Sequence, residues 1–224
     1  MTASSSSVVV LQHRDHIAAG PLFDALASRS LHPETVRLDR DEPLPDPAAF
    51  RRAIILGSDE PARDPWFERE IEWLRRADSS GVSVLGIGTG AQALAVALGG
   101  GIEPARRPRR GWTSLSSALP EVISNGPWLA WDPNVVRLPP RAELLAFNSL
   151  GPQVFRVGGH LGVQFHPEIT PEIIRDWVER SEETLDTQGI HEAMWRDFPA
   201  ASLGAERLFS AFLEFGGRLR SLTT

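Results

Sequence analysis

The segment "GVQFHPE", residues 162–168, contains a histidine and a glutamate with one residue between them. We expect a buried strand that ends at His166, because Pro167 cannot donate a hydrogen bond to a strand ladder. Glu168 then lies two residues beyond His166, where its carboxylate can accept from one imidazole nitrogen and leave the other free as a base. A strand-end histidine beside an incidental acid remains the alternative for this segment alone.

A second segment, "GIGTGAQ" at residues 86–92, predicts a glycine corner between a strand and a helix. Three alternating glycines permit a tight turn and a close approach of other backbone. The amides at the N-terminus of the following helix favour an anion or a developing oxyanion. Such a corner carries a nucleophile in many α/β enzymes, although a turn with only a structural role is the alternative.

The elements that must position these two segments alternate between strand and helix. Apolar β-branched runs predict buried strands over residues 7–11, 36–38, 52–57 and 82–87. Helical patterns occupy residues 21–28, 64–78, 90–98, 171–180 and 203–219, with Thr170 as the N-cap of the fourth helix. Three further strands, partly antiparallel, are expected in "AELLAFNS", "PQVFRVGG" and "HLGVQFHP".

This alternation predicts a three-layer α/β/α sandwich, flavodoxin-like, with a mostly parallel central sheet. No repeat and no linker interrupts the chain, so residues 1–224 are expected to form a single domain. Open sheets of this kind bind ligands at the carboxyl ends of their strands. The glycine corner and the histidine segment both lie at such strand ends, which predicts that they share one site.

Composition excludes several other classes of function. A net charge of −6 argues against a nucleic-acid-binding surface, and the chain has no apolar run of the ~20 residues that cross a membrane. The N-terminus has no basic, apolar leader, so the expected location is the cytoplasm. The chain contains no cysteine, which rules out disulfides, thiolate metal sites and thiol catalysis.

Two other motifs are given ordinary interpretations. His13 and His16 follow the first strand and are expected to line the cleft or face solvent, and no metal site is predicted. The basic run "RRPRR", residues 106–110, is read as a solvated loop. Contact with an anionic substrate or an acidic partner remains an alternative for this run.

Taken together, the two segments resemble the class I glutamine amidotransferase family. The family's elbow reads Gly-Ile-Cys-x-Gly-x-Gln, and its histidine segment reads Gly-x-Gln-Phe-His-Pro-Glu, which this chain matches in full. The likeness extends through "IILGSDEPARDPWFEREIEWLRRA", "RRGWTSL" and "RLPPRAELLA", and is strongest to proteins similar to the glutaminase portion of GMP synthase. It implies a Cys–His–Glu triad that forms a thioester with glutamine and releases ammonia.

The resemblance assigns roles to specific positions. His166 would be the base and Glu168 its orienting acid. Backbone amides near Gly57 and Ser58, and at Thr89, would form the oxyanion hole. Gln92, Arg110, Trp112 and Asp132 fall at positions near the substrate. The resemblance implies no cofactor. The expected ligand is a small molecule, glutamine-like or an amide, and a separate synthase partner is left open.

The pattern breaks at Gly88, which stands where the family has its cysteine. Thr89 is displaced by one residue and is a weaker nucleophile, so we expect it to supply its amide and cap the helix. Arg110, Asp132 and Asn134 also depart from the family pattern, which favours a native glycine. The main hypothesis is a divergent member or pseudoenzyme that binds a metabolite or partner. There are two alternatives. One is an enzyme of different chemistry with His166 as general base, and the other is an active glutamine amidotransferase or γ-glutamyl amide hydrolase seen as an engineered cysteine-to-glycine variant.

Overall fold

The computed structural model describes residues 7–14, 20–57, 65–106, 110–131, 133–181 and 185–219. Its strands are β1 (Val8–Gln12), β2 (Glu34–Arg37), β3 (Arg52–Ile55), β4 (Ser83–Ile87), β5 (Gly101–Pro104), β6 (Gly111–Thr113), β7 (Ser116–Ser117), β8 (Trp128–Ala130), β9 (Asn134–Arg137), β10 (Glu143–Asn148), β11 (Gly151–Val157) and β12 (His160–Val163). Its α-helices are α1 (Gly20–Ala27), α2 (Pro65–Ser79), α3 (Thr89–Ala97), α4 (Pro171–Arg180) and α5 (Thr187–Phe215).

Eight strands form the central sheet in the order β2-β1-β3-β4-β12-β11-β10-β7. The first five pair in parallel, and β11, β10 and β7 extend the sheet in antiparallel fashion. Two small antiparallel pairs, β5 with β9 and β6 with β8, lie outside it. The prediction of a mostly parallel central sheet with an antiparallel extension is therefore confirmed.

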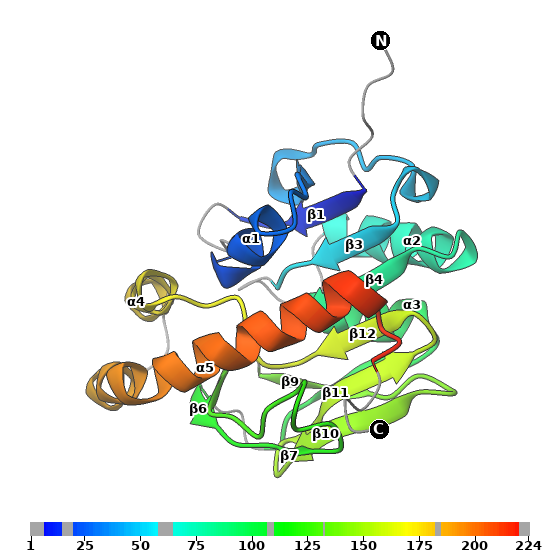
Figure 1. Cartoon of the computed structure of the whole chain (residues 1–224). Coiled ribbons are helices and arrows are strands. Elements are labelled where there is room, and N and C mark those ends of the chain that lie inside the picture. The colour runs from blue at the N-terminus through cyan, green and yellow to red at the C-terminus, as the bar shows by residue number, and fades with distance from the viewer. Residues whose placement is uncertain are drawn as a thin grey trace.

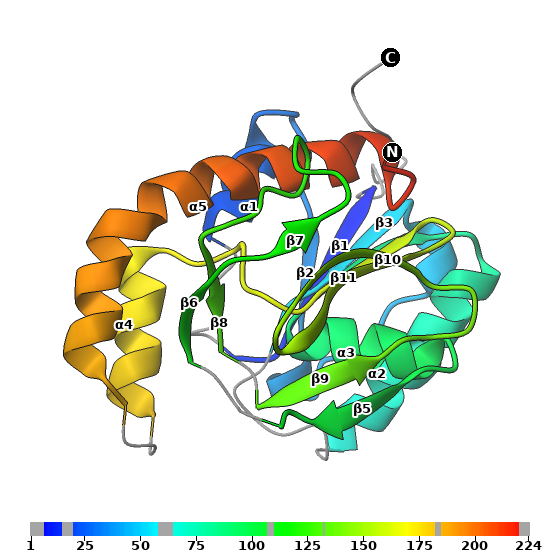
Figure 2. The same ribbon diagram turned by 90° about the horizontal axis from the view of Figure 1, so that it is seen from below.

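Helices cover both faces of the sheet. Figures 1 and 2 show α1 and α5 on one face and α2 and α3 on the other. The buried strand β1 serves both layers: Val8 and Val10 belong to the core that includes the side chains of α1 and α5, and Val9 and Leu11 to the core on the α2 and α3 side. Because successive strand residues point to opposite faces, an unbroken apolar run is what a doubly covered strand requires.

One strand end and one helix start differ from the predictions in ways that affect the site or the packing of the helices. The strand predicted to end at His166 stops at Val163. The Gln164 amide still donates to the Gln153 carbonyl of β11 at 2.8 Å, and two residues later the His166 amide donates to the Leu129 carbonyl of β8 at 2.9 Å. Pro167 is therefore not what ends the strand. His166 lies on an irregular segment whose backbone is held by β8.

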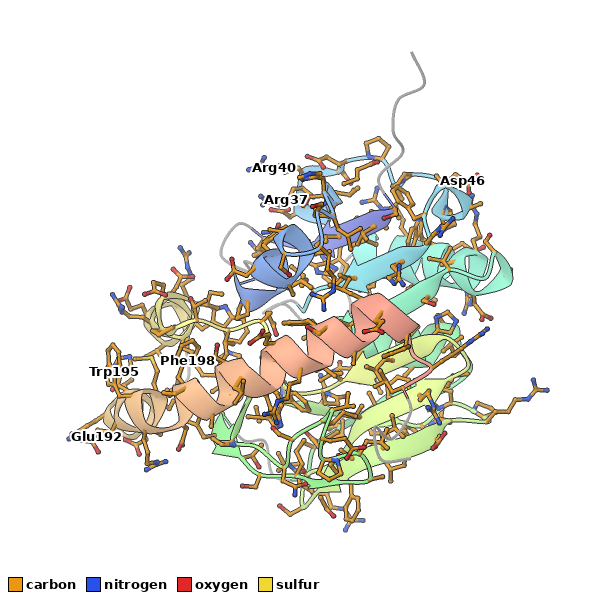
Figure 3. All side chains as sticks on the ribbon, in the orientation of Figure 1. Arg37, Arg40, Asp46, Glu192, Trp195 and Phe198 are labelled. Carbon is orange, nitrogen blue, oxygen red and sulfur yellow. The ribbon has the colours of Figure 1, made fainter. Side chains whose placement is uncertain are left out.

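The last helix is much longer than predicted, because α5 begins at Thr187 and not at residue 203. Pro199 lies inside it, where proline lacks an amide hydrogen and favours a kink. Figure 2 shows α5 changing direction between the end beside α4 and the end over the sheet. Figure 3 shows Trp195 and Phe198 on the part beside α4, and Trp195 is 70% exposed. None of the helices within the described ranges is both long and apolar enough to cross a membrane.

The glycine corner is tightly packed, as its sequence predicts. A Cβ atom on Gly86 would overlap the backbone of Gly90, and one on Gly90 would overlap the carbonyl of Ile55. The backbone of α3 thus lies directly against β3 and β4. This close approach places the N-terminus of α3 at the carboxyl ends of the two central strands.

Candidate functional site

Parallel pairing brings the carboxyl ends of four strands to one edge of the sheet. Strands β1, β3, β4 and β12 are neighbours in register. The chain leaves them at His13, Gly57, Gly88 and the segment that carries His166. We call these strand ends, together with Glu168, the strand-end site.

Gly88 makes the turn from β4 into α3 with φ +55° and ψ −119°. A positive φ strains any residue with a side chain, so glycine suits this position. The Gly88 amide donates to the Val163 carbonyl at 2.8 Å, which ties the corner to the start of the histidine segment. Thr89 is the first residue of α3 and Gly88 is its N-cap, so the prediction that Thr89 caps the helix is wrong.

Gly88 faces the imidazole of His166. An ideal Cβ on Gly88 would lie 2.7 Å from Cε1 and 3.2 Å from Nε2 of His166. Gly57 borders the same ring, because its Cβ position is 3.2 Å from Cε1 of His166 and 3.7 Å from the Thr89 amide nitrogen. The prediction that residues 88 and 166 share one site therefore agrees with the geometry.

The imidazole of His166 is held by a buried carboxylate. Its Nδ1 lies 2.8 Å from Oε1 of Glu168, and the two residues are 5% and 0% exposed. An ionised Glu168 accepts a hydrogen bond from Nδ1–H. The other ring nitrogen, Nε2, then has a free lone pair and faces Gly88. Such an imidazole can accept a proton from a bound molecule or from water.

Trp177 packs against the His166 ring, and Trp131 packs against Trp177 in turn. Trp177 of α4 meets the imidazole edge-on with ring centroids 4.8 Å apart, and Trp131 lies 5.5 Å from Trp177. Arg110 donates to the Trp131 carbonyl, and its guanidinium carbon lies 5.2 Å from the centre of the Trp131 ring. The sequence did not single out Trp177, whose proximity depends on the way α4 packs.

Of the remaining predicted site residues, some are buried and others lie outside the described residues. Gln92 is buried in α3, and Trp112 is buried in β6. Ser58 and Asp132, with His16 and most of the basic run at residues 106–110, lie outside the described residues. Among the described residues there is no cluster of three or more side chains suited to hold a metal ion.

A second histidine–glutamate pair lies beside the first, and sequence reasoning missed it. His13 is 1% exposed and its Nε2 is 2.6 Å from Oε2 of Glu70, which is fully buried in α2. Of the two alternatives expected for His13, lining the cleft or facing solvent, the second is wrong because the side chain is buried. A signal for Glu70 was present, because it lies on the apolar helix face formed by Phe67, Ile71 and Leu74, where a carboxylate needs a partner.

The comparisons with known proteins agree with this architecture. Residues 20–176 match the family described as glutamine amidotransferase class-I. The chain belongs to the class I glutamine amidotransferase family. It is 36% identical over 97 residues to a GMP synthase [glutamine-hydrolyzing] of Thermomicrobium roseum and 34% identical over 106 residues to that of Nitrosomonas eutropha. These matches cover 40% of the chain and only 18% and 20% of the two synthases.

Solved amidotransferase structures share the fold over nearly the full length. A glutamine amidotransferase from Methylobacillus flagellatus superimposes with a TM-score of 0.86, covering 99% of both chains at 20% identity. One from Thermotoga maritima gives a TM-score of 0.82, covering 97% of this chain and 100% of that chain at 19% identity. At such identities the likeness establishes the amidotransferase fold and leaves the activity to the site residues.

Proposed function

We propose that this chain is a divergent class I amidotransferase-like protein that binds a small metabolite at the strand-end site without hydrolysing glutamine by the family route. The observation that carries the proposal is Gly88, whose Cα faces the imidazole of His166. By resemblance, this is the position of the family's cysteine. Without a thiol no thioester forms, and loss of a catalytic nucleophile costs on the order of 10⁶ in turnover.

The binding groups in this proposal are those that persist around Gly88. The Thr89 amide lies at the N-terminus of α3, where the helix dipole stabilises a carbonyl oxygen or a carboxylate. His166 offers Nε2, and Gly57 forms the adjacent backbone wall. Gln92, Trp112 and Arg110 are proposed to shape the surroundings, and Ser58 and Asp132 are proposed as further contacts. A glutamine-like or amide-bearing molecule matches these groups.

A second candidate function, general-base catalysis by His166, is supported by the intact His166–Glu168 pair. A buried carboxylate is costly unless it is partnered, and here it orients an imidazole that packs against Gly88. A substrate with its own nucleophile, or water, would then supply the attacking atom. Glycine does not enlarge the site at this point, because the imidazole fills the volume that a Cβ would need.

Ammonia release and glutamine binding together test the main proposal. We expect the unmodified chain to release no more ammonia from glutamine than His166→Ala does. Isothermal titration should show binding of glutamine or a related amide that is weakened at least tenfold in His166→Ala. Ammonia release by the unmodified chain that disappears in His166→Ala would contradict the proposal, and Gly88→Cys serves as the comparison for a restored thiol.

A separate synthase partner and a cytoplasmic location are further parts of the proposal. The support for a partner is that the matched GMP synthases carry much additional chain beyond the matched region. Mixing the chain with a synthase domain and measuring complex formation by analytical ultracentrifugation tests this part. Fractionation of cells that express the chain tests the location.

A further inference from the structure

The buried His13–Glu70 pair has no part in the proposed binding, yet it adjoins the site through Gly57. His13 Nδ1 lies 3.1 Å from the Gly57 carbonyl oxygen, while its Nε2 contacts Glu70. On its other side, Gly57 borders Cε1 of His166. Gly57 therefore lies between two buried histidine–glutamate pairs.

The contacts of His13 determine its tautomer. A carbonyl oxygen can only accept, so Nδ1 of His13 carries a proton and donates it to Gly57. Nε2 and Oε2 of Glu70 then share one proton, either as imidazolium with carboxylate or as neutral imidazole with carboxylic acid. In both arrangements Nδ1 remains a donor, because the contact of Nε2 with Glu70 leaves the Nδ1 proton in place.

Burial excludes a direct chemical role for His13. Both ring nitrogens are engaged, the side chain is 1% exposed, and the Trp66 ring lies 4.2 Å away between centroids. No nitrogen is left to accept a proton from a ligand or to bind a metal ion. The arrangement suits a group that acts through the backbone of Gly57.

We infer that His13 and Glu70 form a positioning pair that holds the Gly57 wall of the strand-end site against His166. Gly57 lies beyond the end of β3, so the ladder hydrogen bonds of the sheet do not fix its carbonyl. The His13 donor supplies a fixed contact there, and the buried Glu70 keeps the ring from turning. Loss of this donor frees the carbonyl to turn and moves Gly57 relative to the imidazole of His166.

Asparagine and glutamine separate the two contacts of His13. His13→Asn places an amide nitrogen near the Nδ1 position and keeps a donor for Gly57. His13→Gln places one near Nε2, keeps a contact with Glu70 and loses the donor. The matched control is His160→Gln. His160 is also buried, and its Nε2 lies 3.0 Å from Oδ1 of Asp78. It is the first residue of β12, so it lies at the end of this strand opposite to the histidine segment.

The readout is the ¹H–¹³C resonance of His166 at ε1, assigned by its loss in His166→Ala. We expect it to shift in His13→Gln, and to stay at the position of the unmodified chain in His13→Asn and His160→Gln. No shift in His13→Gln, or an equal shift in all three variants, overturns the inference. No ligand is needed, so this result is separate from the outcome of the binding proposal.

Glu70 provides a second pair of variants if His13→Gln does not fold. Glu70→Gln can donate to Nε2 and so preserves the Nδ1–H form, whereas Glu70→Ala removes the partner. We expect the His166 resonance to shift in Glu70→Ala and to stay in place in Glu70→Gln. Imidazole ¹⁵N shifts of His13 should show a protonated Nδ1 in Glu70→Gln, and an unprotonated Nδ1 there would contradict the assigned tautomer.

Discussion

The imidazole ring of His166 occupies the space that a Cβ atom on Gly88 would need, so the two cannot both be present without a shift. The imidazole ring cannot move freely away from Gly88, because Nδ1 is hydrogen-bonded to Glu168 at 2.8 Å and Trp177 is in T-shaped contact with the ring. A side chain at residue 88 must therefore either displace His166 or strain the corner. In this chain the imidazole, the carboxylate and the glycine form one fitted unit.

The first prediction concerns Gly88→Ala, which introduces both backbone strain and contact. A side chain at a strained backbone position costs about 1–3 kcal/mol, and the contact with Cε1 of His166 adds to that cost. Gly158→Ala is the matched control, since Gly158 has φ +56° and nothing within 4 Å of its Cβ position. Urea unfolding should show a larger loss of unfolding free energy for Gly88→Ala than for Gly158→Ala. Equal losses would show that the contact between residue 88 and His166 contributes nothing.

Much of the fold follows from local sequence patterns. The unbroken β-branched run of β1 identifies a strand that is covered on both faces, and the spacing of Phe67, Ile71 and Leu74 identifies α2 as a helix with one buried face. The positions of α1, α3 and α4 are likewise predicted within one or two residues. The start of α5 could not be predicted, because Pro199 is unfavourable in a helix interior and the packing of α5 against α1, α4 and β6 is not visible in the sequence.

The candidate site is predictable only where its residues are close in sequence. His166 and Glu168 are separated by one residue, so their contact follows from the motif. Glu70 lies 57 residues from His13, and Trp177 reaches His166 through the packing of α4. Those contacts depend on which strand ends and helices become neighbours, and sequence spacing does not carry that information.

The second prediction concerns Glu168, the orienting carboxylate. Glu168→Ala leaves the Nδ1–H of His166 buried without an acceptor, which costs about 1–3 kcal/mol of unfolding free energy. Glu168→Gln costs less, because its amide oxygen still accepts the proton. Chemical denaturation of both variants checks the order, with the exposed Glu179→Ala of α4 as control. Equal losses in Glu168→Gln and Glu168→Ala would show that the charge of the carboxylate, and not its acceptor oxygen, is what stabilises the pair.

The third prediction concerns Thr170, which caps the helix that presents Trp177. Its side chain accepts from the Ile173 amide at 3.3 Å. Thr170→Ala should lower the free energy of unfolding by about 1 kcal/mol, whereas Thr170→Ser keeps the acceptor and most of the stability. Thermal unfolding monitored by circular dichroism distinguishes the two. Equal stability of Thr170→Ala and the unmodified chain would exclude a capping contribution.

The fourth prediction concerns Trp177, which fills the space between Trp131 and His166. Trp177→Ala removes a buried aromatic ring and should cost about 3–5 kcal/mol, with a smaller loss in Trp177→Phe. Both variants should also move the ε1 resonance of His166, because the imidazole and the indole are in T-shaped contact. Trp195→Phe is the control on α5: Trp195 is 70% exposed, so its replacement should change stability by less than about 0.5 kcal/mol. If Trp177→Phe leaves the His166 resonance in place, the aromatic side chain does not set the environment of the imidazole.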